Sequence, residues 1–161
     1  MSKVDAKLAE RGLVLPAPLQ LPEGMVLPFP EVNLRGTRAF ISGTGPLNPD
    51  GSVAGPFGKV GTDVTVEEAA HLARLTGLAM IAGLKRTLGD LDRVSGWVHA
   101  FGMVNCAPEF SQQPTVINGF SNLILDVFGP EIGQHARSAV GMSSLPMQIA
   151  VEIEAEVEVR V

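Results

Sequence analysis

The sequence Gln148-Ile-Ala-Val-Glu-Ile-Glu-Ala-Glu-Val-Glu-Val-Arg-Val161 alternates between apolar residues and a second, mostly polar set. Because successive side chains of a β-strand point to opposite faces of its sheet, this period of two predicts a strand with one apolar face. The apolar face, which we expect to pack on the core, carries Ile149, Val151, Ile153, Ala155, Val157, Val159 and Val161. Four glutamates share the other face, at Glu152, Glu154, Glu156 and Glu158, either as a solvated surface or as part of a site.

Residues 135–142 predict a second strand, which residues 143–147 join to the last one. If the two strands form a hairpin that is symmetric about this linker, Arg137 lies directly opposite Glu152. Directly opposed residues share a sheet face, so both would lie on the polar face. The alternate residues Ser138, Val140 and Met142 would then join the apolar face, beneath the helices.

Arg137 has two interpretations in this arrangement. It could form a cross-strand ion pair with Glu152 and bind nothing else. Alternatively, its small neighbours Ala136, Ser138 and Ala139 leave room for a ligand to reach the guanidinium. The rigid donor fork of arginine suits a carboxylate, which it can bind through two hydrogen bonds.

Two long helices are predicted from apolar residues at helical spacing. The first spans residues 66–88 and begins with a capping-box pattern, Thr65 followed by Glu68. The second spans residues 114–128, with Pro114 in its first turn and Gly129 after its end. Further predictions are strands at 37–42 and 93–106, a short helix at 2–11 and a proline-rich extended arm up to residue 30. The order after the first helix is β-β-α-β-α-β-β, in which the strands with ranges above are four of the five, and it predicts a single α+β domain over residues 1–161, with both long helices on one sheet face.

Composition narrows the classes of function. The net charge is −5 and the basic residues are scattered, which argues against a nucleic-acid binder. No apolar stretch is long enough to span a membrane, and the first residues lack a secretory signal. The single cysteine, Cys106, excludes an internal disulfide and suits the cytoplasm. The three histidines show no metal-binding spacing, and His71 and His135 are interpreted as structural or solvated.

Several segments resemble the reactive-intermediate-deaminase family, also called Rid, RidA or YjgF. The resemblance is most specific in His135-Ala-Arg-Ser-Ala-Val-Gly-Met142, the following Leu145-Pro146 and the strand Val151-Glu-Ile-Glu-Ala155. Phe40-Ile-Ser-Gly43 and Gly89-Asp-Leu-Asp-Arg-Val94 support it. The resemblance covers roughly residues 25–160, and the added arm indicates a longer branch of the family.

The resemblance implies a chorismate-mutase-like fold, with a mixed sheet, and a homotrimer with its sites between subunits. It implies hydrolysis of reactive imines and enamines, such as 2-aminoacrylate, to 2-keto acids and ammonia, without a metal or cofactor. Arg137 corresponds to the arginine that holds the substrate carboxylate, and Glu152 to the acidic residue that positions the attacking water. Asn118 corresponds to an asparagine near the pocket, and Phe29 fills the space of a tyrosine found in some deaminases.

The chain departs from the deaminase pattern at two points. Ala139 stands where the family often has a cysteine, and the chain has no tyrosine. Both changes leave carboxylate binding intact and bear on the hydrolytic step. Two functions therefore remain open: an imine deaminase, and a trimer of the same fold that binds a small carboxylate without turnover.

Overall fold

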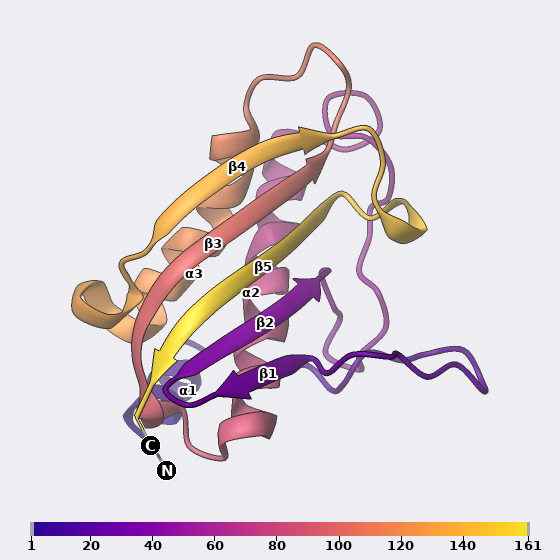
Figure 1. The fold of residues 1–161 in the computed structure, drawn as a ribbon. Helices are drawn as coiled ribbons and strands as arrows, with labels where there is room; N and C mark the ends of the chain where they lie inside the picture. The colour runs from indigo at the N-terminus through magenta and orange to yellow at the C-terminus, as the bar shows by residue number, and fades with distance from the viewer. Residues whose placement is uncertain (1, 161) are drawn as a thin grey trace.

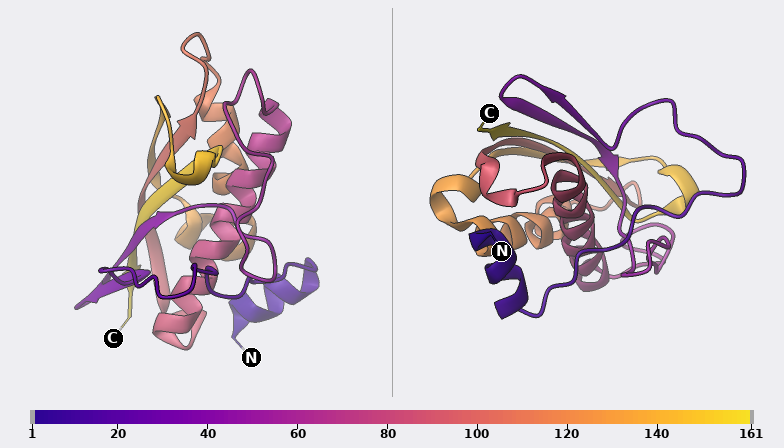
Figure 2. Two further views of the ribbon diagram at one scale, coloured as in Figure 1. Left: turned by 90° about the vertical axis from the view of Figure 1, so that its right-hand side faces the viewer. Right: turned by 90° about the horizontal axis from the view of Figure 1, so that it is seen from below.

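The computed structural model describes residues 2–160 as one mixed sheet with helices on one face (Figure 1). The sheet has five strands in the order β1-β2-β5-β3-β4. Figure 2 shows the two long helices, α2 and α3, on one side of the sheet and the opposite face uncovered. The predicted α+β class, with two long helices on one face, is confirmed. The strands are β1 (Val32–Arg35), β2 (Arg38–Thr44), β3 (Val94–Asn105), β4 (Ala136–Met142) and β5 (Val151–Val159), and the helices are α1 (Lys3–Glu10), α2 (Val66–Leu88) and α3 (Gln113–Gly133).

The helix ends follow their local sequence. Thr65 and Glu68 form the predicted capping box at the start of α2, which ends at Gly89 with a φ of 76°. In α3, Gly129 has a non-helical backbone with a φ of 77°, so the regular helix ends where the sequence predicts it. A β-carbon on Gly119 of α3 would lie 1.9 Å from the carbonyl oxygen of Ala70. Glycine at this position therefore lets the two helices pack closely.

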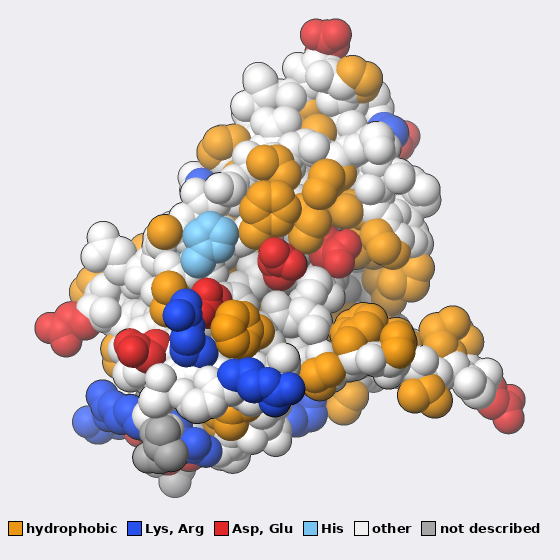
Figure 3. Space-filling view, viewed as in Figure 1, with side chains coloured by type: hydrophobic (Ala, Val, Ile, Leu, Met, Phe, Trp, Pro, Cys, Tyr) orange, Lys and Arg blue, Asp and Glu red, His pale blue; other side chains and the backbone are white. Residues whose placement is uncertain are grey.

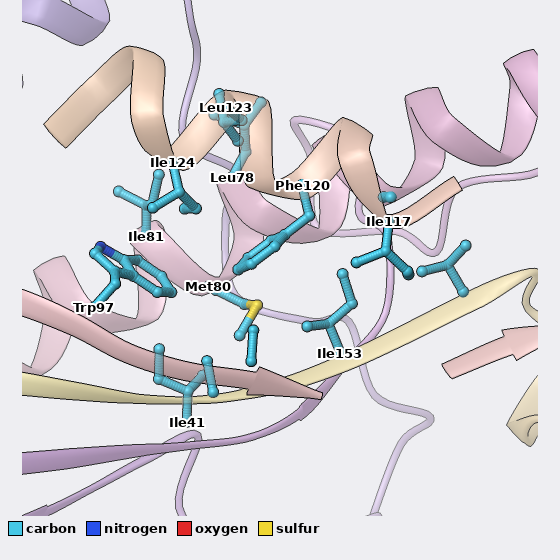
Figure 4. Close-up of a cluster of buried hydrophobic side chains, with 14 of the residues drawn as sticks. Ile41, Leu78, Met80, Ile81, Trp97, Ile117, Phe120, Leu123, Ile124 and Ile153 are labelled. Atoms are coloured by element: carbon cyan, nitrogen blue, oxygen red, sulfur yellow. The ribbon is translucent and has the colours of Figure 1, made fainter. Parts of the chain in front are cut away.

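The core lies between the helices and the sheet (Figure 4). Phe120 of α3 and Met80 of α2 are fully buried against Ile153 of β5. Trp97 of β3 packs edge-on against Phe120, with ring centroids 5.7 Å apart. Val151, Ile153, Ala155, Val157 and Val159 of β5 are all buried, which confirms the apolar face predicted from the alternation.

The predicted hairpin between the last two strands is wrong. β4 pairs in parallel with β3, and β3 pairs antiparallel with β5, so β3 lies between them. The segment β3-α3-β4 is a strand–helix–strand crossover, which places its two strands side by side and parallel. The linker then passes through a short 3₁₀ helix, Pro146–Gln148, before β5 begins. Two residues of this turn, Met147 and Gln148, have positive φ angles.

This pairing reverses the predicted face of β4. Arg137 is paired with Ala100, and Ala100 with Ala155, on the face that the helices cover. Arg137 therefore does not lie opposite Glu152, which is paired with Met103 on the open face. The neighbouring residues Ser138, Val140 and Met142 lie on the open side of the sheet. The prediction that they join the apolar face beneath the helices is therefore wrong. The cross-strand ion pair between Arg137 and Glu152 is excluded.

The proline-rich arm runs along the outside of the domain before β1 (Figures 1 and 2). Its first part is fixed to a loop that follows β2: the amides of Ala17 and Gln20 donate to the carbonyls of Pro49 and Gly51. Residues 21–30 are exposed. No helix within residues 2–160 is long and apolar enough to cross a membrane.

Candidate functional site

Arg137 is held at the sheet edge by α3. One terminal nitrogen, Nη1, donates to Asn118 Oδ1 at 2.8 Å and to Ser121 Oγ at 3.1 Å. The other, Nη2, donates to the carbonyl of Pro114 at 3.4 Å. We call this group, Arg137 with Asn118, Ser121 and the Pro114 carbonyl, the arginine site. It positions the guanidinium while leaving Nε and one Nη2 hydrogen without a partner among the described residues.

A chain of hydrogen bonds behind Arg137 fixes Ser121. His135 Nδ1 lies 2.7 Å from the carbonyl of Gly133, so this nitrogen carries the proton and donates. His135 Nε2 then accepts from the Ser121 hydroxyl, 3.0 Å away, and Ser121 Oγ accepts from Arg137. This tautomer is assigned from the hydrogen-bond pattern. Burial lowers the pKa of His135, as does the positive charge of Arg137, which favours the neutral ring that the chain requires.

The charge of Arg137 is uncompensated within residues 2–160. All three of its partners are neutral oxygens, and none of the ion pairs in this part of the chain includes it. Burial lowers the pKa of Arg137, although a guanidinium stays protonated at physiological pH. A half-buried cation with free donors favours an anionic ligand, and a carboxylate fits its geometry.

Glu152 lies at a second position, on the open face. A β-carbon on Gly43 would lie 2.3 Å from Glu152 Oε1, so glycine is needed there for the carboxylate to lie over the β2 backbone. Burial raises the pKa of Glu152, and the nearby charge of Glu154 raises it further. No hydrogen bond from the described residues offsets this rise. A carboxylate of raised pKa without a donor is suited to accept a proton or a hydrogen bond from water.

Glu152 lines a cavity of about 460 Å³ between the arm, the end of β2 and the 3₁₀ helix before β5. We call it the glutamate pocket. Phe29, at the end of the arm, also lines this pocket. Figure 3 shows acidic and hydrophobic side chains lying side by side on this open face.

The structure therefore separates the four predicted site residues into two groups. Arg137 and Asn118 meet in the arginine site, and Glu152 and Phe29 meet in the glutamate pocket. The two groups lie on opposite faces of the sheet, so one small ligand cannot touch both within one chain. No cluster of three metal-ligating side chains is found within residues 2–160.

Sequence reasoning missed Ser121 and His135. Ser121 follows Asn118 by three residues on α3, which places both on one helix face, and this spacing could have linked them. His135 could not be assigned in the same way. Its partner Ser121 lies on another element, and the β3-α3-β4 crossover brings the two together.

Comparisons with known proteins match nearly the whole chain. A family model described as "YjgF/chorismate mutase-like, putative endoribonuclease" matches residues 13–155, a range that contains both sites. Protein TCP17 of Trypanosoma cruzi is 39% identical over 156 residues, which cover 97% of this chain and 94% of that protein.

Two solved structures share the fold at high similarity. Protein Atu1372 of Agrobacterium tumefaciens, whose function is unknown, is 38% identical with a TM-score of 0.86, and the match covers 98% of this chain and 94% of that one. A protein of Shewanella oneidensis, described as a "putative endoribonuclease", is 27% identical with a TM-score of 0.85, over 97% and 99% of the two chains.

Proposed function

Since the chain belongs to the YjgF/chorismate mutase-like family, we propose that it hydrolyses reactive 2-imino and 2-enamino acids in sites shared between subunits of a homotrimer. The products are 2-keto acids and ammonia. We place this activity in the cytoplasm, in keeping with the single cysteine of the chain.

One observation supports the proposal: the two groups of residues lie on opposite faces of the sheet, and each offers a part that the reaction needs. The arginine site offers an uncompensated cation at the edge strand β4. The glutamate pocket offers an unpartnered carboxylate of raised pKa on the open face. In a ring of subunits the two contact surfaces of each chain differ, so the β4 edge of one subunit can meet the open face of the next. The substrate would lie between them.

The chemistry follows from the two groups. The substrate carboxylate binds the free donors of Arg137, and Glu152 takes a proton from a water molecule as its oxygen attacks the imine carbon. Glu152 passes this proton to the imine nitrogen, which gives a carbinolamine with both OH and NH₂ on that carbon. The ionised Glu152 then takes the proton of the hydroxyl as the C=O bond forms and passes it to the nitrogen, which leaves as ammonia as the C–N bond breaks. Water and imine become keto acid and ammonia without an oxidant, so the step requires no cofactor.

A second candidate is a trimer that binds a small carboxylate without turnover. Two features of the sequence favour it: Ala139 in place of the cysteine frequent in the family, and the absence of tyrosine. Such a protein needs only the arginine site. The charge of the open face disfavours a ribonuclease. Four glutamates of β5 face the open side, at Glu152, Glu154, Glu156 and Glu158, and they would repel RNA phosphates.

The proposal is tested by adding purified protein to 2-imino acids generated in place by an amino-acid oxidase. We expect faster loss of the imine, followed with a trapping amine, and matching release of keto acid and ammonia. An imine lifetime unchanged from that in buffer would reject the deaminase. Keto-acid binding measured by calorimetry on the same sample would then decide whether the chain is the non-catalytic binder.

The shared site makes a separate prediction about mixed subunits. Arg137→Ala and Glu152→Gln chains are each expected to be inactive, but they should complement one another when refolded together. In random trimers about one quarter of the interfaces would pair an intact Arg137 with an intact Glu152. We therefore expect the mixture to regain about one quarter of wild-type activity. Light scattering should give a mass near three times 16.9 kDa. A monomeric mass, or a mixture without activity, would contradict the shared site.

A further inference from the structure

We propose that the glutamate pocket receives a bulky apolar side chain of the substrate, and that the proline-rich arm provides the wall that selects it. This inference rests on the proposed function, because it names the class of 2-imino acid that the shared site takes. The favoured substrates are those with branched aliphatic or aromatic side chains. The small 2-aminoacrylate and iminopyruvate are poor ones.

The size of the pocket is the first argument. Its volume of about 460 Å³ falls within the roughly 300–1,000 Å³ of pockets that enclose drug-sized ligands. A three-carbon imino acid held by its carboxylate at Arg137 would leave most of this space empty. A branched or aromatic side chain would fill it and exclude water.

The polar groups of the wall are the second argument. Three of the four polar side chains in the lining are already engaged within the chain. Glu31 is paired with Arg86, the Ser42 hydroxyl donates to the carbonyl of Pro30 at 2.8 Å, and the Thr44 hydroxyl donates to the carbonyl of Ser42 at 2.8 Å. The fourth is Glu152. A ligand therefore finds one free polar group beside an apolar surface, which suits an imine with a hydrocarbon side chain.

The arm forms a large part of that apolar surface. Leu19, Leu21 and Leu27 line the pocket from the arm, and Met147 and Ile149 line it from the segment before β5. Leu21 is 37% exposed and Leu27 is 39% exposed, so a ligand would remove further apolar surface from water.

The start of this wall is formed before a ligand arrives. Gln20 lies between Leu19 and Leu21 and makes two hydrogen bonds to the loop after β2. Its backbone N–H donates to the carbonyl of Gly51 at 2.9 Å, and its side-chain Nε2 donates to the carbonyl of Asp50 at 2.8 Å. A β-carbon on Gly51 would lie 2.2 Å from the carbonyl oxygen of Pro18, so glycine there lets the arm lie close against the loop. A fixed wall favours selection by size, because little order has to be gained on binding.

The test compares two keto acids that differ only in the side chain, pyruvate and 4-methyl-2-oxopentanoate, by titration calorimetry on the full-length protein. Each additional buried carbon strengthens binding about fourfold, so three carbons predict a preference of roughly 50-fold for the larger acid. The Leu21→Ser and Leu27→Ser variants should reduce this ratio at least fivefold each. The matched control is Val26→Ser on the same arm, because Val26 is 84% exposed and does not line the pocket. It should keep the wild-type ratio.

Turnover of the imines of alanine and leucine, measured on the same variants, separates the two proposals. Equal affinity for the two keto acids, or a ratio that both leucine variants leave unchanged, would overturn the inference about the pocket whether or not imines are hydrolysed. A strong preference that depends on the arm, without hydrolysis of either imine, would support the pocket and reject the deaminase.

Discussion

Replacing Arg137 with alanine is expected to lower kcat/KM for 2-imino acids by about 10²–10⁴-fold. The substitution removes two charge-assisted hydrogen bonds to the substrate carboxylate, each worth roughly 1.5–3 kcal/mol. The free energy of unfolding should change little, because Arg137 lies at the sheet edge and its partners Asn118 and Pro114 are exposed to water. Thermal unfolding of the purified variant, together with imine turnover and keto-acid binding, measures both effects.

Two further variants sharpen this result. Arg137→Lys keeps the positive charge but loses the planar fork, so it should fall between wild type and Arg137→Ala in binding. Arg35→Ala is the matched control: Arg35 is an exposed strand arginine on β1, and within residues 2–160 its side chain bonds only to the carbonyl of Leu34. Its kinetics should equal those of wild type. Turnover that persists in Arg137→Ala would place the substrate carboxylate elsewhere.

Glu152→Gln is expected to slow turnover by about 10²–10⁴-fold, the usual loss when a general base is removed. Keto-acid binding should be nearly unchanged, because the substrate carboxylate binds Arg137. The effect should therefore appear in kcat. Glu158→Gln is the control on the same strand and face, since Glu158 is exposed and lies outside the pocket. An equal loss of kcat in both variants would show that the negative charge of the face matters, and not Glu152 itself.

The pH profile gives an independent signature. Glu152 must be ionised to accept a proton, and burial raises its pKa above that of an ordinary glutamate. Turnover should therefore decline as the pH falls through this raised value, and Glu152→Gln should lack that decline. The contribution of Glu152 to the free energy of unfolding should change in the opposite direction, becoming less unfavourable as the pH falls. A carboxyl whose pKa is higher in the folded state opposes folding when ionised, so this unfavourable contribution is present at neutral pH and disappears as the pH falls below the unfolded value.

The sequence predicted individual elements well where the pattern is local. The alternation of β5 and the capping box of α2 each depend on residues within one segment, and both are confirmed. Symmetry about the linker predicts the wrong partner for β4. The crossover through α3 sets the neighbour of β4 instead, and the 3₁₀ helix at residues 146–148 lets the chain pass β3 before β5 begins.

The candidate site could be predicted only in part for the same reason. Family motifs marked Arg137 and Glu152, but their sheet faces depend on long-range pairing. Proline content predicted an extended arm without showing that Leu21 and Leu27 line the same pocket as Glu152. The first part of the arm is held there by hydrogen bonds to residues 49–51, which no local pattern encodes.

The strand order also has a consequence for synthesis on the ribosome. β5 is the last described strand to emerge, yet it lies in the middle of the sheet, between β2 and β3. Until it arrives, the pairs β1-β2 and β3-β4 cannot join, and the helices lack the apolar face that β5 contributes. The nascent chain must therefore carry two separate sheet fragments with unpaired edges, which is the state most prone to association with other chains. The alternating glutamates of β5, absent from those fragments, reach the sheet only in the step that closes it.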